Sequence, residues 1–187
     1  TIPGVTGKIN YNPNTKTLTL DSVTIAPQGK YSAISSKLDG LKIELIGNNT
    51  IDMDTVSASG IFLDSTSATI NGNGVLNVSS TKEAIVASKS SLSIKNCKVN
   101  SISSIAGISG AYTNSSLSID NATVTAIGTS NGSIIAFNGG ISLTNSIIVQ
   151  PVGAKITGAN VTDTNDTIIK TEVKIIAIYD LWICGTQ

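Results

Sequence analysis

Short segments in which every second residue is aliphatic recur along this chain. The segment Ser91–Ser101 reads SLSIKNCKVNS, and it is repeated almost letter for letter as SLSIDNATVTA at Ser116–Ala126 and more loosely as GISLTNSIIVQ at Gly140–Gln150. With Leu92 as the reference, the pattern starts at intervals of 23 to 27 residues, at Leu18, Leu41, Ala68, Leu92, Leu117 and Ile141. Alternation with a period of two predicts β-strands with one buried face and argues against helices.

A second landmark, a small or polar residue followed by isoleucine, recurs in step with the first. It occurs at Ala33-Ile34, Gly60-Ile61, Ala84-Ile85, Gly107-Ile108 and Ser133-Ile134. In four of the five places the isoleucine stands 7 residues before the next segment start, and at Ile108 the gap is 9. Such a period indicates stacked repeats. We therefore predict an all-β fold, a right-handed single-stranded parallel β-helix, or β-solenoid, of about six coils with terminal capping strands.

The two ends of the sequence are expected to cap this stack. Residues 8–11 can form a strand over the first coil, and the Asn-Pro-Asn sequence at 12–14 is a turn signal. Pro151 stops the last strand, residues 158–166 form a polar loop, and the apolar density of residues 167–178 predicts two short strands. The predicted organisation is an N-terminal cap segment at 1–17, coils at 18–150, a loop and capping strands at 151–178, and a tail at 179–187.

Asparagines stand four places after the last three segment starts, at Asn96, Asn121 and Asn145. Asparagine tolerates the left-handed backbone conformation, and its amide can bond to the same amide one coil away. We therefore predict a sharp corner with a short asparagine ladder. One place earlier in the repeat, Lys95 and Asp120 fall on neighbouring coils, which predicts an exposed ion pair of little energetic weight.

The second and third coils are expected to be wider at this corner. Ile51 and Val78 stand ten places after their segment starts, whereas Val99 and Val124 stand seven places after theirs. The additional residues include the Gly-Asn-Asn sequence at 47–49, which is typical of a bulge or turn.

Composition limits the class of protein further. The 187 residues suffice for one domain with a continuous core, and 40 percent of them are hydrophobic. All 12 basic residues are lysines, 12 acids balance them, and arginine and histidine are absent. We therefore expect no nucleic-acid binding and, without an apolar run of 18 residues, no membrane insertion. Cys97 falls in a small core slot and Cys184 in the tail, so two free thiols are favoured over a disulfide.

Several phrases resemble one family of extracellular proteins. These phrases are GKINYNPNTKTLTLDSVTI at 7–25, GNNTI at 47–51, the repeated LSI coils and the closing YDLWICGTQ. Together they resemble bacterial proteins with a pectate-lyase-like parallel β-helix, labelled carbohydrate-binding domain-containing. In that family a YDLW phrase opens a module, so the resemblance implies that residues 179–187 begin a following unit of a tandem array. It also implies an extracellular or cell-surface location, polysaccharide binding and calcium binding, although no signal peptide is recognisable in the sequence.

Candidate catalytic chemistry is sparse. The catalytic β-helices of pectate lyases, pectin methylesterases and polygalacturonases each use an arginine or a histidine, and this chain has neither. Lys95 could act as a base only if burial lowered its pKa, and the acids Asp52, Asp54 and Asp64 have no register relation that brings them together. We expect no catalytic residue and no resident cofactor. Calcium remains an alternative for the oxygen-rich sequences at 52–54 and 163–166.

Sugar binding usually requires exposed aromatic rings with polar neighbours. Tyr31 and Tyr112 lie in loop-like sequences rich in Ser, Gly and Asn, so they are the carbohydrate-binding candidates. The alternative for both is packing over the edge of the solenoid. Phe62 and Phe137 follow the isoleucine landmark and are assigned to packing.

An outward column of hydroxyls suggests a third possibility, a face that binds ice or another crystal. The column consists of Thr19, Thr69, Ser93, Ser118 and Ser142. Lys42 interrupts it, which argues against a flat surface matched to a lattice.

The sequence therefore favours a non-catalytic extracellular or cell-surface module with a structural or adhesive role that binds carbohydrate. The alternative is a divergent polysaccharide lyase or glycoside hydrolase of the β-helix type. An enzyme should have a groove with at least two convergent ionisable side chains, whereas a spacer should have ladders of Ser, Thr and Asn without a cleft.

Overall fold

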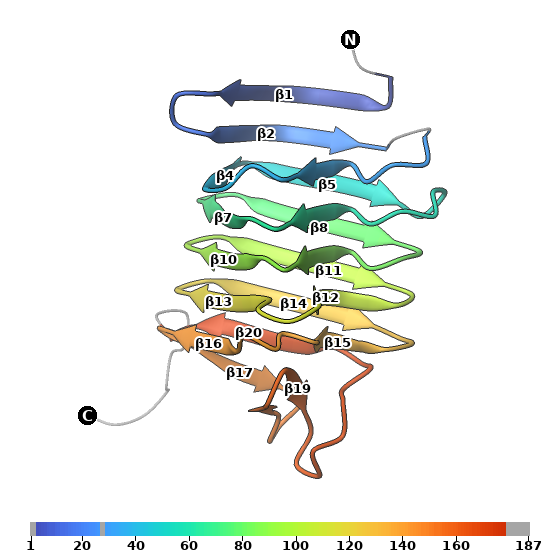
Figure 1. Cartoon of the computed structure of the whole chain (residues 1–187), viewed down its shortest axis with the longest axis vertical. Helices are drawn as coiled ribbons and strands as arrows, with labels where there is room; N and C mark the ends of the chain where they lie inside the picture. Colours follow the sequence, from blue (N-terminus) through green and yellow to red (C-terminus); the bar gives the residue numbers. More distant parts are fainter. Residues whose placement is uncertain (1–2, 27–28, 179–187) are drawn as a thin grey trace, which may run out of the picture.

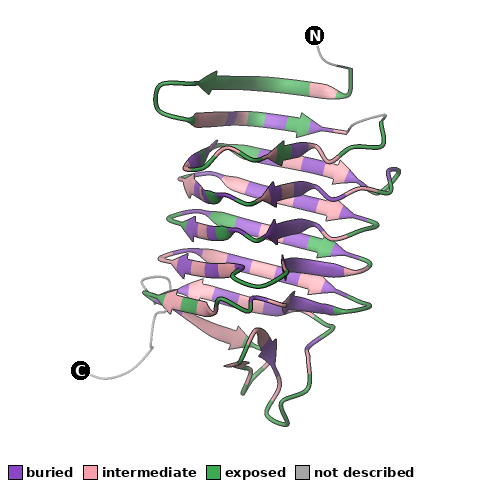
Figure 2. Cartoon of the chain, in the orientation of Figure 1, coloured by how far each residue is buried: buried purple, intermediate pink, exposed green. Residues whose placement is uncertain are grey.

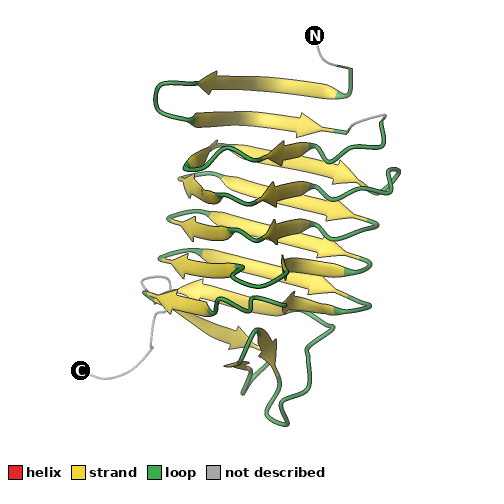
Figure 3. Ribbon diagram, in the orientation of Figure 1, coloured by secondary structure: helices red, strands yellow, loops and turns green. Residues whose placement is uncertain are grey.

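The chain folds into a stack of β-coils with a hairpin at its N-terminal end (Figure 1). The structure is a computed structural model, and it describes residues 3–26 and 29–178. Figure 3 shows strands joined by loops throughout this part of the chain. Within these residues, no helix has the length and apolar character needed to cross a membrane. The predicted all-β fold is confirmed.

The strands form three columns, and neighbouring strands within a column pair in parallel. The first column contains β4 (Leu41–Ile46), β7 (Ser67–Gly72), β10 (Ser91–Lys95), β13 (Ser116–Asp120) and β16 (Ile141–Thr144). The second contains β5 (Asn48–Met53), β8 (Val75–Ser80), β11 (Lys98–Ser103) and β14 (Thr123–Gly128). The third contains β3 (Ile34–Ser36), β6 (Ile61–Asp64), β9 (Ile85–Ser88), β12 (Ala106–Ala111) and β15 (Gly132–Ile135). In the first coil, β2 (Thr17–Ile25) pairs with both β4 and β5.

Both landmarks of the repeat mark stacked positions. In the first column, Leu92 pairs with Ala68 on one side and with Leu117 on the other, and Leu117 pairs with Ile141. In the third column, the isoleucines of the second landmark pair in register through all five coils. The predicted stacking is therefore confirmed from the second coil onward.

The predicted start of the first coil is wrong by two residues. Leu18 pairs with Ile43 and not with Leu41. Because alternate residues of a strand point to the same face, a shift of two residues leaves the same face buried. The alternating pattern alone therefore could not distinguish the two registers.

The corner between the first and second columns is wider in coils two and three by one residue, and not by the three that the sequence suggested. Val78 pairs with Ile51 as expected, but on the other side it pairs with Ser101 and not with Val99. Val99 pairs with Leu76. Matching one buried valine to another displaced the predicted register by two residues, again without changing the buried face.

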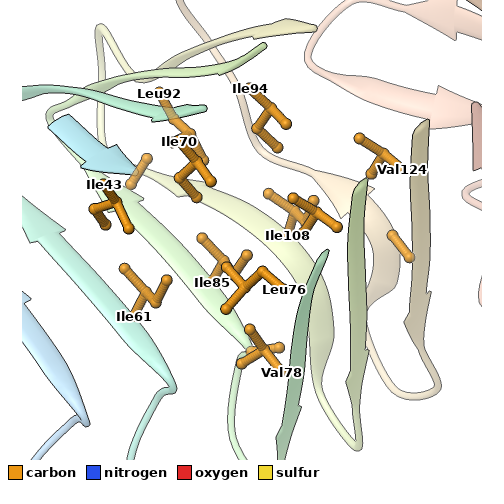
Figure 4. Close-up of a cluster of buried hydrophobic side chains, with 14 of the residues drawn as sticks. Ile43, Ile61, Ile70, Leu76, Val78, Ile85, Leu92, Ile94, Ile108 and Val124 are labelled. Atoms are coloured by element: carbon orange, nitrogen blue, oxygen red, sulfur yellow. The ribbon is translucent and has the colours of Figure 1, made fainter. Parts of the chain in front are cut away.

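Inward-facing residues of the three columns form a continuous apolar core. Figure 2 shows buried positions alternating with more exposed ones along the strands, and Figure 4 shows the buried side chains of successive coils. Ile70 of the first column, Leu76 of the second and Ile85 of the third are all fully buried. Burial of each such side chain contributes about 1.5 to 3 kcal/mol to folding.

The small residue before each landmark isoleucine lies where the second and third columns approach closely. A Cβ atom added to Gly60 would lie 2.3 Å from Cγ1 of Val78 and 2.8 Å from the carbonyl oxygen of Ala84. Both separations are shorter than van der Waals contact, so a larger side chain would force the columns apart. This close approach explains why the landmark requires a small residue.

The N-terminal cap has the predicted form. Strand β1 (Val5–Asn12) pairs antiparallel with β2 and contains the expected strand segment 8–11. In the turn that follows, Oδ1 of Asn12 accepts a hydrogen bond from the backbone N–H of Asn14 at 3.0 Å. Most of β1 is exposed on the outside of the stack (Figure 2).

The C-terminal end differs from the prediction. The region expected to be a polar loop contains half of a hairpin, formed by β18 (Lys155–Thr157) and β19 (Asn160–Thr162). Residues 167–178 contribute one strand, β20 (Val173–Ala177), and an isolated bridge at Ile168. The predicted tail at 179–187, with its YDLW phrase and Cys184, lies outside the described residues.

Strand β20 ends the regular stacking. It lies antiparallel between β14 and β17 (Ser146–Gln150), in the place where a sixth coil would continue the second column (Figure 1). Only β16 of that coil continues a column, by pairing with β13. The solenoid therefore has about five turns rather than six.

Candidate functional site

The corner between the first and second columns is built on residues in the left-handed conformation. Asn96, Asn121 and Asn145 have φ values of 52°, 48° and 48°. At the same corner, Ser22 and Gly47 have φ values of 54° and 65° in the first two coils. Asparagine and glycine adopt this conformation at the lowest cost, so their recurrence here follows from the geometry of the turn.

The predicted asparagine ladder forms between two of its three members. Asn121 donates from Nδ2 to Oδ1 of Asn96 at 2.9 Å, across neighbouring coils. Asn145 instead donates from Nδ2 to Oδ1 of Asp120 at 3.2 Å. A carboxylate is a stronger acceptor than an amide oxygen, which accounts for the different partner.

The predicted ion pair between Lys95 and Asp120 is not formed. The two residues are paired on neighbouring strands, as expected, but the ion pairs among the described residues join Lys37 to Asp64 and Lys155 to Asp166. Asp120 accepts the hydrogen bond from the Asn145 amide described above. Lys95 is exposed, and holding its long side chain against one carboxylate would gain little in water.

A second amide ladder, on the outer face of the second column, was not predicted. Asn100 donates from Nδ2 to Oδ1 of Asn77, and Asn77 donates from Nδ2 to Oδ1 of Asn48, both at 2.8 Å. Asn77 and Asn100 are paired in register. They are 23 residues apart in the sequence, and this spacing could have revealed the ladder. The mistaken alignment of Val78 with Val99 placed the two asparagines out of register.

An open groove of about 910 Å³ runs along the corner beside the Asn96–Asn121 rung. Its walls come from four successive levels of the stack, namely the start of β8, the corner before β11, the corner before β14, and strand β20. The lining combines the amides of Asn73, Asn96 and Asn121, the hydroxyl of Thr123 and the amines of Lys98 and Lys174. Among the described residues, no carboxylate belongs to this lining. We call it the corner groove.

The third titratable side chain of the corner groove, Cys97, is inert. It is buried, and desolvation raises the pKa of its thiol to about 12. Its Sγ contacts the carbonyl oxygen of Ile70 at 3.7 Å. The thiolate is the reactive form of cysteine, so a thiol held protonated in this way is a core residue and not a nucleophile. Cys97 is free, whereas Cys184 is not among the described residues.

Asp52 and Asp64, two of the three acids considered for catalysis, have carboxylates engaged in local contacts at different corners. Oδ1 of Asp52 accepts from the backbone N–H of Asp54 at 3.0 Å. Asp64 lies 3.1 Å from Nζ of Lys37, and hydrogen bonds from Lys37 and from the Ser65 hydroxyl hold the pKa of the Asp64 carboxyl below its usual value. Across residues 3–26 and 29–178, no three side chains of the metal-binding types gather into a group.

The oxygen-rich loop at 163–166 is organised by its own backbone. Oδ1 of Asp163 accepts from the N–H groups of Asn165 and Thr167, at 2.8 and 2.9 Å. Asp166 lies 2.9 Å from Nζ of Lys155, and the hydrogen bonds from Lys155 and from Thr157 lower the pKa of the Asp166 carboxyl. These contacts explain the turn without an added ligand.

The two candidate tyrosines do not form a shared platform. Tyr31 is 85 percent exposed in the loop between β2 and β3, and Tyr112 is 68 percent exposed after β12, at the opposite corner of the third column. Nζ of Lys89 lies 5.2 Å from the centre of the Tyr112 ring, a cation–π contact that already occupies one ring face. Neither tyrosine lines the corner groove.

The two phenylalanines differ in burial. Phe137 is fully buried, which confirms its assignment to packing. Phe62 is half-buried and is paired with Val86 on the neighbouring strand.

One member of the predicted hydroxyl column is replaced. Thr69, Ser93, Ser118 and Ser142 are paired in register along the first column, and Lys42 interrupts the column beside Thr69. Thr19 does not belong to it, because it pairs with Glu44; Thr17 lies in its place and pairs with Lys42. The interruption at Lys42 argues against a flat lattice-matching face.

Stacked parallel coils around one apolar core define this chain as a β-solenoid, consistent with a parallel β-helix. Comparisons with models of protein families, with curated proteins and with solved structures found nothing that matches it.

Proposed function

We propose that this protein is a non-catalytic, extracellular or cell-surface β-helix module that binds carbohydrate along its corner groove. The observation that carries this proposal is the lining of the groove, which combines stacked amides, a hydroxyl and amines on neighbouring coils. Sugar hydroxyls both donate and accept hydrogen bonds, and amide side chains complement them in both respects.

Rigidity supports a binding role. The groove is lined by strand ends and corners that are paired to the coils above and below, so its polar groups are held in place before a ligand arrives. Binding to a preformed surface loses less conformational entropy than binding to mobile loops. A polymer that follows the stack would meet an asparagine on each of three successive coils, at Asn73, Asn96 and Asn121.

The titratable groups of the groove support a non-catalytic role. General acid–base catalysis of glycosidic cleavage needs two groups that exchange protons, most often carboxylates flanking the bond. The groove contains two lysines and a buried thiol. The carboxylates of Asp52 and Asp64 do not line it.

A glycan array probed with and without calcium tests the proposal, together with lyase and hydrolase assays on the glycans that bind. Binding without turnover, weakened when Asn121 is replaced by alanine, is the expected outcome. Turnover of any bound polysaccharide would refute the non-catalytic role and show that the protein is a divergent lyase or hydrolase. Absence of binding to every glycan would remove the carbohydrate role and leave a structural one.

A further inference from the structure

The corner groove is positively charged because of how the C-terminal strand returns to the stack. Lys98 is the first residue of β11, and it pairs with Thr123 of β14. Lys174 belongs to β20, which runs antiparallel on the other side of β14 and pairs Lys174 with Thr125. Two lysines distant in the sequence are therefore separated by a single intervening strand.

The spacing of these lysines is set by the sheet. Neighbouring strands are about 4.8 Å apart, so Lys98 and Lys174 stand about 10 Å apart in the stacking direction, and the offset from Thr123 to Thr125 displaces them by about 7 Å along the strands. Their backbones are therefore about 12 Å apart on a diagonal, and their long flexible side chains can bring the amines to the spacing of alternate sugars in an extended 1,4-linked chain. A polymer that crosses the coils obliquely could then place an anionic group near each amine.

No acid among the described residues lines the groove to cancel its positive charge. The nearest acids in sequence are Asp120, beside Asn121, and Glu172, two residues before Lys174, and neither lines the groove. Asp120 is engaged by the amide of Asn145. Within the described part of the lining, an anionic ligand would therefore meet amines and amides and no carboxylate.

We propose that the corner groove is a calcium-independent site for a linear anionic polysaccharide that crosses neighbouring coils and is held by Lys98 and Lys174. This inference rests on the proposed carbohydrate-binding function and specifies the charge of its ligand. The shared chemistry is a repeating anionic group, carboxylate or sulfate, on an extended sugar chain. The amides of Asn96 and Asn121 contact the sugar hydroxyls between the charges.

Three polymers with one backbone test the inference, namely carboxymethyl cellulose, cellulose sulfate and the neutral hydroxyethyl cellulose. Binding is measured by titration calorimetry at low and high salt, in the presence of a calcium chelator. The anionic polymers are expected to bind, more weakly as salt rises, because salt screens exposed charge pairs. The carboxylate and sulfate arms distinguish which anion is preferred.

Lysine variants locate the site. Lys98→Gln and Lys174→Gln should each weaken anionic binding by about 2- to 5-fold, the range expected for one exposed charge pair. Lys82→Gln, at an exposed lysine outside the groove, is the matched control and should bind as the unmodified protein does. Circular dichroism and thermal unfolding verify that each variant is folded.

A gain of binding provides a test that misfolding cannot imitate. Val75 of β8 lines the groove and pairs with Lys98 of β11, on the side of β11 that faces away from β14. Val75→Lys should extend the row of positive charges and tighten anionic binding by about 2- to 5-fold.

The outcomes separate the inference from the function beneath it. Equal binding of the neutral and anionic polymers, or anionic binding that is unchanged in both Lys98→Gln and Lys174→Gln, would overturn the inference and leave carbohydrate binding in place. Failure of all three polymers and of the glycan array would overturn both.

Discussion

Replacing Asn121 by alanine and by glycine separates backbone strain at the corner from the hydrogen bond that crosses it. Asn121 has a φ of 48° and donates to Asn96 at 2.9 Å. Alanine removes the amide and also disfavours the left-handed conformation. Glycine removes the same amide but adopts this conformation freely.

The expected magnitudes follow from these two terms. A left-handed conformation costs an ordinary residue about 1 to 2 kcal/mol, and a hydrogen bond contributes about 0.5 to 1.5 kcal/mol net. Asn121→Ala should therefore destabilise the protein by about 2 kcal/mol. Asn121→Gly should destabilise it by about 1 kcal/mol, since it loses the rung and adds flexibility to the unfolded chain.

Urea unfolding followed by circular dichroism measures both variants, and the slope of the free energy against urea verifies that the same surface is exposed. Ser118→Ala, an outward-facing residue of the preceding strand, is a control that leaves the corner unchanged. The reasoning would be refuted if Asn121→Ala were as stable as Asn121→Gly, because the corner would then carry no left-handed constraint.

Three further predictions concern the core and the third column. Burial raises the pKa of the Cys97 thiol from 9.0 to about 12, so this thiol ionises at lower pH in the unfolded chain than in the folded one. The free energy of unfolding should therefore fall as pH rises from about 9 to about 12. Urea titrations of Cys97→Ala should lack that part of the pH dependence. Gly60→Ala should destabilise by about 1 to 3 kcal/mol, since the added methyl group meets a valine side chain, whereas Gly29→Ala, with open space around it, should not shift the urea midpoint. Lys37→Gln should raise the pKa of the Asp64 carboxyl toward its ordinary value, as followed by the NMR shift of that side chain during an acid titration; an unchanged pKa would show that Lys37 does not set it.

The candidate site could be predicted only in part from the sequence. The Asn96–Asn121 rung could be predicted because both residues occupy the same place in a nearly exact repeat. The rung between Asn77 and Asn100 was missed, since a two-residue misalignment leaves the buried face unchanged and so gives no warning. Tyr31 and Tyr112 were chosen for their composition, which carries no information on whether two loops share a face.

The amino-acid pattern was sufficient to predict the repeating coil, its inward-facing residues and the pairing of Leu92 with Leu117, because burial imposes a period of two within strands and a constant length between them. The folded chain was needed to show where the stack ends and which charges meet. Strand β20 has the same alternation whether it pairs in parallel or antiparallel, so its insertion beside β14 depends on pairing energies over the whole sheet. That insertion brings Lys174 to the groove lined by Lys98, and no local pattern encodes this meeting of distant segments.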